Sequence, residues 1–105
     1  MKRNMKMKIK LIEDYEDKQK IARQLLEALP EWFGIEEARE NYIKDSTDQL
    51  FFVALDENQA TGFLCLKETS KDTLELSVMG VLKEYHRQGI GKELFLKAKR
   101  FASEN

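Results

Sequence analysis

The stretch with the clearest chemical potential lies near the C-terminal end, where a strand-like run leads through a short polar loop into a helical pattern. Gly89 and Gly91 fall at this junction, and Arg87 and Lys92 flank them. At the start of a helix several backbone N–H groups lack partners within the helix, and the helix dipole adds roughly half a positive charge. Glycines let a ligand approach the main chain, and the cations could add charge-assisted hydrogen bonds. The pattern predicts an anion site that accepts phosphate.

Two common phosphate-binding motifs do not fit this segment. A Walker loop needs a fixed spacing between its glycines and its lysine, followed by Ser or Thr, and the dinucleotide fingerprint needs a third glycine within a parallel βαβ unit. The residues around Gly89 meet neither requirement. The elements that position the loop are therefore needed to interpret it.

The N-terminal half of the chain reads as one strand and two helices. Residues 6–12 alternate charged with apolar side chains, as an edge strand with one solvated face does. Apolar residues recur at helical spacing over residues 17–30, and either Asp14 or Asp17 could be the N-cap of this helix. Residues 35–43 predict a second, shorter helix, and residues 31–34 an aromatic linker between the two.

Three strands are expected to follow. Residues 50–55 are strongly β-prone, residues 60–67 are another apolar stretch, and the polar residues 56–59 predict a turn between them. A second polar turn over residues 69–72 leads into residues 73–81. This last strand is expected to alternate strictly, with Leu74, Leu76 and Val78 on one face and Glu75, Ser77 and Met79 on the other.

A final helix is predicted from Gly89 onward, because apolar residues recur there at spacings of three or four. The order is β-α-α-β-β-β-α, without a repeat or a linker. It predicts an α/β (α+β-like) fold with a mixed, largely antiparallel sheet, in a single domain over residues 1–105.

Composition limits the classes of function. The chain is 42% hydrophobic and 35% charged, which is typical of a soluble globular protein. Its formal charge of -1 gives no strong basic field, so we expect no nucleic acid and no membrane as partner. Cys65, the only cysteine, excludes an internal disulfide and a cysteine-rich zinc site, and it is expected to be a buried structural thiol. No apolar run is long enough to span a membrane, so a cytoplasmic protein is expected.

The loop sequence resembles the central motif of the GCN5-related N-acetyltransferases (GNAT), Arg/Gln-x-x-Gly-x-Gly/Ala, preceded by a strand that ends in valine and followed by a helix. The family's order of elements is also the order read above, so the resemblance covers essentially the whole chain. His86 departs from the family's usual Arg or Gln. The six positions of the motif are occupied by His86, Arg87, Gln88, Gly89, Ile90 and Gly91.

This resemblance implies an enzyme that transfers the acetyl group of acetyl-CoA to a primary amine of a small molecule, peptide or protein, without a metal. It implies that the backbone of Met79 and Val81 pairs with the pantetheine arm. Residues His86 to Lys92 would wrap the pyrophosphate, and the amide of Met79 or Gly80 would stabilise the oxyanion.

Glu75 is the candidate general base, because several members of the resembling family carry a carboxylate on this strand that deprotonates the amine, often through water. The alternative is that Glu75 is only the solvated side of a strand. Trp32, Phe33 and Tyr42 either shape an acceptor pocket or pack in the core. Tyr85 either packs on the adenine or caps the strand end.

The family continues beyond the last predicted helix, so the fold is expected to be C-terminally truncated, and the chain to be an incomplete domain or one completed by a homodimer. The isolated chain is then expected to turn over little. Two other readings remain open: a non-catalytic CoA-binding or regulatory module, and an interaction domain whose glycines only make a turn.

Overall fold

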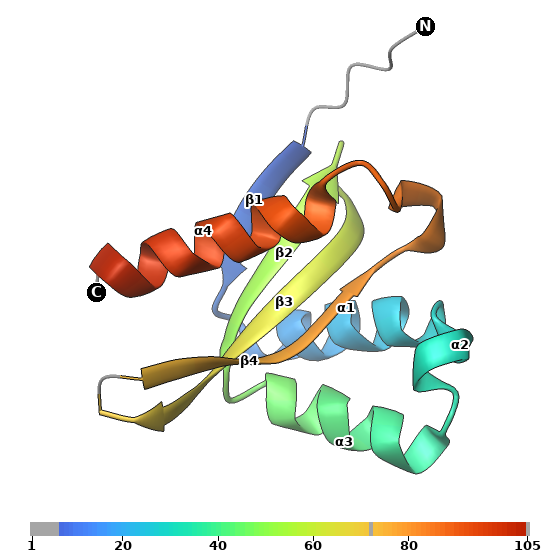
Figure 1. Cartoon of the computed structure of the whole chain (residues 1–105). Helices are drawn as coiled ribbons and strands as arrows, with labels where there is room; N and C mark the ends of the chain where they lie inside the picture. Colours follow the sequence, from blue (N-terminus) through green and yellow to red (C-terminus); the bar gives the residue numbers. More distant parts are fainter. Residues whose placement is uncertain (1–6, 72, 105) are drawn as a thin grey trace, which may run out of the picture.

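The computed structural model describes residues 7–71 and 73–104, except for the side chains of Trp32 and Phe33 and of the last helical residue (Figure 1). Its strands form an antiparallel sheet in the order β1-β2-β3-β4. The elements are β1 (Met7–Ile12), α1 (Tyr15–Glu27), α2 (Pro30–Phe33), α3 (Glu36–Ser46), β2 (Leu50–Asp56), β3 (Gln59–Ser70), β4 (Thr73–Val81), the short 3-10 helix η1 (Lys83–Tyr85) and α4 (Ile90–Glu104).

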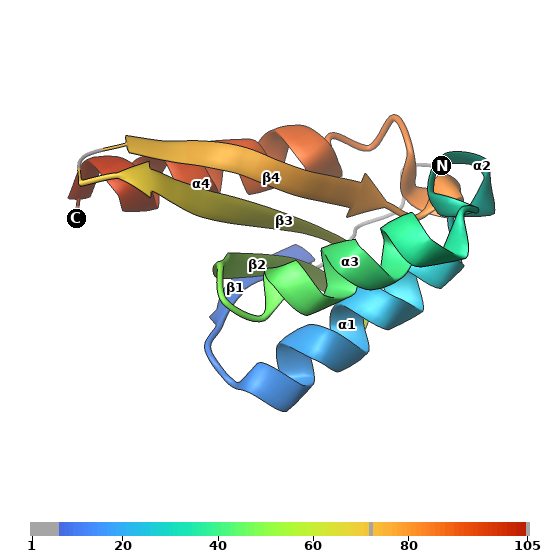
Figure 2. The same ribbon diagram turned by 90° about the horizontal axis from the view of Figure 1, so that it is seen from below.

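The predicted order of elements is confirmed, with two short additions, α2 and η1. The aromatic segment expected to be a linker instead forms the single turn α2. Pro30 occupies its first position, where the fixed φ of proline suits a helix and its missing N–H costs nothing. This turn redirects the chain between α1 and α3, which pack against each other (Figure 2).

Of the two N-caps predicted for the first helix, the structure has Asp14, and α1 begins at Tyr15. The side chain of Asp14 accepts a hydrogen bond from the N–H of Asp17 at 3.0 Å and so caps the first turn. Arg23 then joins α1 to α3 through two hydrogen bonds of 2.7 Å to Glu40. The hydrogen bond from Arg23 holds the pKa of Glu40 below its usual value.

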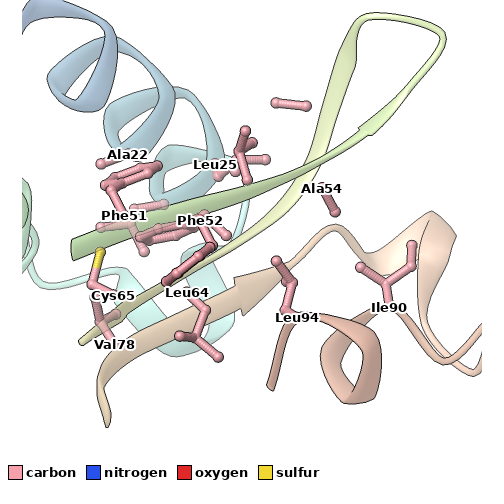
Figure 3. Packing of buried hydrophobic residues seen from close by; sticks show 14 of the residues in the cluster. Ala22, Leu25, Phe51, Phe52, Ala54, Leu64, Cys65, Val78, Ile90 and Leu94 are labelled. Atoms are coloured by element: carbon pink, nitrogen blue, oxygen red, sulfur yellow. The ribbon is translucent and has the colours of Figure 1, made fainter. Parts of the chain in front are cut away.

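Both faces of the sheet are covered, which explains why residues 50–55 of β2 and 62–66 of β3 are apolar without a break. On the face toward α1, Phe51 and Phe63 stack with their ring centroids 5.2 Å apart. On the other face Phe52 meets Phe101 of α4 edge-on, with the ring centroids 5.6 Å apart. Figure 3 shows this division, with Ala22 and other α1 residues on one side and the residues of α4 on the other. Burial of each such ring contributes about 2 kcal/mol.

The turn between β2 and β3 lies where the polar residues predict it. Glu57 and Asn58 have φ angles of 51° and 77°, the left-handed pair that a tight two-residue hairpin requires. Asparagine adopts this conformation more readily than most residues. The second hairpin turn is shorter than predicted, because β3 extends to Ser70 and β4 begins at Thr73. Residue 72 lies outside the described residues.

The strict alternation predicted for β4 is wrong. Leu66 pairs with Leu76 and Cys65 pairs with Val78, so Ser77 is an extra residue opposite β3. Such a bulge shifts the side-chain phase by one. Leu76 therefore shares the α4 face with Met79, and Val78 lies on the α1 face.

Candidate functional site

The loop between β4 and α4 lies at the end of the sheet, beside the start of α4 (Figure 1). The chain leaves β4 at Val81, and Leu82 still donates a hydrogen bond of 2.8 Å from its N–H to the carbonyl of Thr61 in β3. After η1 the residues 86–89 run to Ile90, whose buried side chain anchors the first turn of α4. Both ends of the loop are thus fixed to the core.

The main-chain N–H groups from Arg87 to Lys92 are available to a ligand. Among the described residues, none accepts a hydrogen bond from them; the first N–H of this region with a partner is that of Glu93, bonded to the carbonyl of Gly89 at 2.9 Å. These groups lie at the start of a 15-residue helix, where the dipole favours an anion. The geometry suits a phosphate group.

The glycines of the loop differ in their surroundings. Gly89 has a φ of 77°, and a Cβ built there would meet no atom within 4 Å, so the space beside it is open. At Gly91 a Cβ would lie 3.6 Å from Cε of Met79 and 4.0 Å from Cγ2 of Val81. The start of α4 therefore rests on the end of β4, which brings the loop and the strand edge together.

The free edge of β4 presents the backbone of the two residues predicted to bind pantetheine. Because the N–H of Leu82 is bonded to β3, alternation along the strand turns the N–H and C=O of Val81 and Met79 away from the sheet. The same alternation points the N–H of Gly80 toward β3. Of the two amides considered for the oxyanion, only that of Met79 faces the open edge.

Two side chains before the loop have contacts that the sequence did not predict. Nε2 of His86 lies 2.8 Å from the carbonyl oxygen of Val81, so this nitrogen carries the hydrogen. The buried hydroxyl of Tyr85 donates to the carboxylate of Asp56 at 3.1 Å. Tyr85 was expected either to pack on the adenine or to cap a strand end, and this contact with the last residue of β2 matches the second alternative. Asp56 is 29 residues away in sequence, and no local signal links the pair.

The charged and polar side chains of the loop are exposed. Arg87 has a φ of 67°, a left-handed conformation that is costly for a residue with a side chain. Its side chain and that of Lys92 are open to solvent. Gln88 donates from Nε2 to the carbonyl oxygen of Glu84 at 3.2 Å. The cations predicted to contact phosphate therefore flank the free N–H groups.

Glu75 lies on β4 as predicted, but on the other face of the strand. It pairs with Lys67 before the bulge, which places it on the α1 face, opposite the side chain of Met79. Its side chain is exposed. Tyr42 of α3 is 40% exposed and so is not a core residue, and the side chains of Trp32 and Phe33 lie outside the described part of the chain.

Cys65 is a buried thiol. Burial raises its pKa to about 12, and the positive charge of Lys18 offsets part of this rise. A thiol that stays protonated at neutral pH is a poor nucleophile. This agrees with the structural role predicted for it.

The raised pKa of Cys65 predicts a pH dependence of stability. The folded thiol holds its proton up to about pH 12, whereas the unfolded thiol loses it near pH 9, so its contribution is complete below about pH 9 and falls as the pH rises toward 12. We expect the free energy of unfolding of the wild type, relative to Cys65→Ala, to fall by about 1 kcal/mol per pH unit above pH 9. Urea denaturation of both proteins across this range measures it; a constant difference would contradict the expectation.

In residues 7–71 and 73–104, no group of three or more His, Cys, Asp or Glu side chains is arranged to hold a metal ion. No helix in the same residues is long and apolar enough to cross a membrane. A depression of about 600 Å³ runs along the exposed side of α1, far from the loop and bounded by that helix alone.

The sequence profile of the acetyltransferase (GNAT) family matches residues 18–105. Since this match spans most of the chain, the chain belongs to the GNAT family of acetyltransferases. No curated protein sequence matches it.

Solved structures with the same fold are also acetyltransferases. The PaiA N-acetyltransferase of Thermoplasma acidophilum, in complex with coenzyme A, is 24% identical with a TM-score of 0.72, over 95% of this chain and 74% of that one. An IAA acetyltransferase from Bacillus cereus is 26% identical with a TM-score of 0.71, over 93% and 59%. An aminoglycoside acetyltransferase from an uncultured soil metagenomic sample, in complex with sisomicin, is 24% identical with a TM-score of 0.68, over 93% and 70%. This chain thus spans part of each relative.

Proposed function

We propose that this protein binds acetyl-CoA at the loop before α4 and transfers its acetyl group to a primary amine. The observation that carries the proposal is the run of main-chain N–H groups from Arg87 to Lys92 without an acceptor among the described residues. Family membership supports acetyl transfer in general, and a solved relative with this fold is a complex with coenzyme A.

The coenzyme would contact both the loop before α4 and the free edge of β4, which meet at Gly91. Its diphosphate would accept hydrogen bonds from the loop amides, with the charges of Arg87 and Lys92 beside it. Its pantetheine amides would pair with the outward N–H and C=O of Met79 and with the outward N–H of Val81, whose carbonyl oxygen is bonded to His86, as an added strand does. This path would bring the thioester alongside β4.

The chemistry then needs a positioned amine, a base and an oxyanion donor. The outward N–H of Met79 is the donor in this proposal, because it faces the edge along which the thioester would run. Glu75 is the proposed base. It is four residues before Met79, but the bulge sets their partners on β3 only three residues apart, roughly 10 Å along the strand. A chain of water molecules would therefore have to relay the proton from the amine.

Binding and turnover can be tested separately. Isothermal titration with acetyl-CoA measures binding, and release of free thiol measures transfer to a panel of primary amines. The panel includes sisomicin, since one relative is a complex with that aminoglycoside. Saturable binding with transfer to at least one amine supports the proposal. Absence of binding would end it, and binding without transfer to any amine would leave the non-catalytic CoA-binding module.

Replacing Glu75 by Gln tests the base. We expect kcat to fall by about a hundredfold at neutral pH, with little change in the KM for acetyl-CoA, because the amide cannot take up the proton. The matched control is Glu68→Gln, an exposed carboxylate on the neighbouring strand β3. A pH–rate profile of Glu75→Gln that matches the wild type would remove Glu75 as the base.

A further inference from the structure

Two consecutive side chains tie the beginning of the loop to two different parts of the protein. Tyr85, only 8% exposed, is bonded through its hydroxyl to Asp56 at the tip of the β2–β3 hairpin, with 3.1 Å between the oxygens. His86 is bonded through Nε2 to the carbonyl oxygen of Val81 at the end of β4, at 2.8 Å. Each bond reaches an element that is itself held in the sheet.

Apart from the bond from Nε2 of Gln88 to the carbonyl oxygen of Glu84, at 3.2 Å, the residues that follow have little else to hold them. Arg87 and Gly89 both adopt left-handed φ angles, of 67° and 77°. The amides of the loop donate to no described residue, so hydrogen bonds of its own backbone do not fix its shape. The next fixed point is the buried side chain of Ile90. A conformation of this kind persists only where the surrounding structure determines it.

We infer that Tyr85 and His86 are positioning residues for the coenzyme's diphosphate. They hold the loop in the shape that directs its N–H groups to one point, before the ligand binds. Preorganisation of this kind improves affinity because less order has to be gained on binding. The inference rests on the proposed function, since it names the residues that prepare the same site.

The bond from His86 also explains why histidine can replace the Arg or Gln that is usual at the first position of the resembling motif. A carbonyl oxygen only accepts hydrogen bonds, so the residue facing Val81 has to be a donor. Histidine supplies a donor at Nε2, and the Gln or Arg usual in the resembling motif would supply one too. The chemical requirement at His86 is therefore an N–H group that reaches this carbonyl.

Titrations with coenzyme A and with ADP test the role of His86. ADP carries a diphosphate but no pantetheine, so it reports on the loop alone. We expect His86→Ala to weaken both ligands by about tenfold, and His86→Gln to restore the affinity to within about twofold. Glu84→Gln, an exposed side chain of the same turn, is the control and should change either affinity by less than about twofold.

Tyr85→Phe isolates the second tie, because it removes the hydroxyl and keeps the ring in the core. We expect a loss of about tenfold for both ligands. Asp56→Asn, which keeps an acceptor oxygen for Tyr85, should lose less. The backbone ¹H–¹⁵N nuclear Overhauser effect of residues 87–92 gives a readout without ligand: it should fall in His86→Ala and Tyr85→Phe but not in His86→Gln.

The outcomes separate this inference from the proposed function. Unchanged or tighter binding in His86→Ala and Tyr85→Phe would overturn it, as would a loss for coenzyme A without a loss for ADP. If the wild type binds neither ligand, the proposed function fails. The order of residues 87–92 in the variants would then still decide whether Tyr85 and His86 hold the loop: unchanged order would contradict it.

Discussion

Replacing Gly89 by valine should weaken coenzyme A binding by about a hundredfold or more. Gly89 has a φ of 77°, a conformation that a β-branched residue adopts only with strain. Strain of this kind costs about 1–3 kcal/mol, and 1.4 kcal/mol corresponds to a factor of ten in affinity. The added side chain would also occupy the open space beside the free N–H groups. Isothermal titration of the folded variant measures the loss.

A matched variant separates the two causes. Asparagine tolerates the left-handed conformation better than other residues with a side chain, so Gly89→Asn should have less strain than Gly89→Val. We expect its affinity to lie between those of the wild type and the valine variant. If Gly89→Val bound coenzyme A as well as the wild type, the diphosphate could not lie against this glycine.

Replacing Phe63 by alanine should lower the free energy of unfolding by about 3–5 kcal/mol. Phe63 is fully buried in β3, where it stacks on Phe51. A Cβ built at Gly80 would lie 3.3 Å from its ring, so the ring also fills the space under β4. Its removal leaves a cavity between the sheet and α1. Urea denaturation measures the change, which is a large fraction of the stability of a typical domain.

Phe95→Ala is the control for this substitution. Phe95 lies on α4 with 49% of its side chain exposed, and the same chemical change there should cost less than about 1 kcal/mol. Equal losses at Phe63 and Phe95 would mean that the core is not centred on the stacked rings of β2 and β3.

The features predicted correctly from the sequence are those with local signals. Asp14 is a standard N-cap, and its side chain bonds the N–H three residues on. The apolar runs of β2 and β3 and the polar pair Glu57 and Asn58 between them indicate a hairpin by composition alone. The position of the loop before α4 has a local signal too, because its glycines and the start of α4 are adjacent in sequence.

The features missed depend on pairing between distant parts of the chain. Leu74, Leu76 and Val78 fit strict alternation, and the extra residue Ser77 becomes visible only when β4 is aligned with β3. The bond of Tyr85 to Asp56 joins residues that no periodicity connects. The turn α2 has no clear local signal, because proline can follow the end of one helix and also begin the next, as Pro30 does here.

The positions of the candidate site residues could be predicted better than their roles. The sequence places Gly89 and Gly91 at the start of a helix, and the structure has them there. The expected face of Glu75 was wrong, because a single bulge reverses it. The roles of Glu75, Met79 and the loop residues in acetyl transfer stay proposals.

We propose that the amides from Arg87 to Lys92 bind the diphosphate of coenzyme A. A titration of ¹⁵N-labelled protein with coenzyme A, followed by NMR, tests it directly, because a hydrogen bond to phosphate shifts the amide proton downfield. We predict that the largest downfield shifts fall on residues 87–92 and saturate with the same affinity as that measured by calorimetry. Saturable binding that leaves these amide protons unshifted would contradict the account.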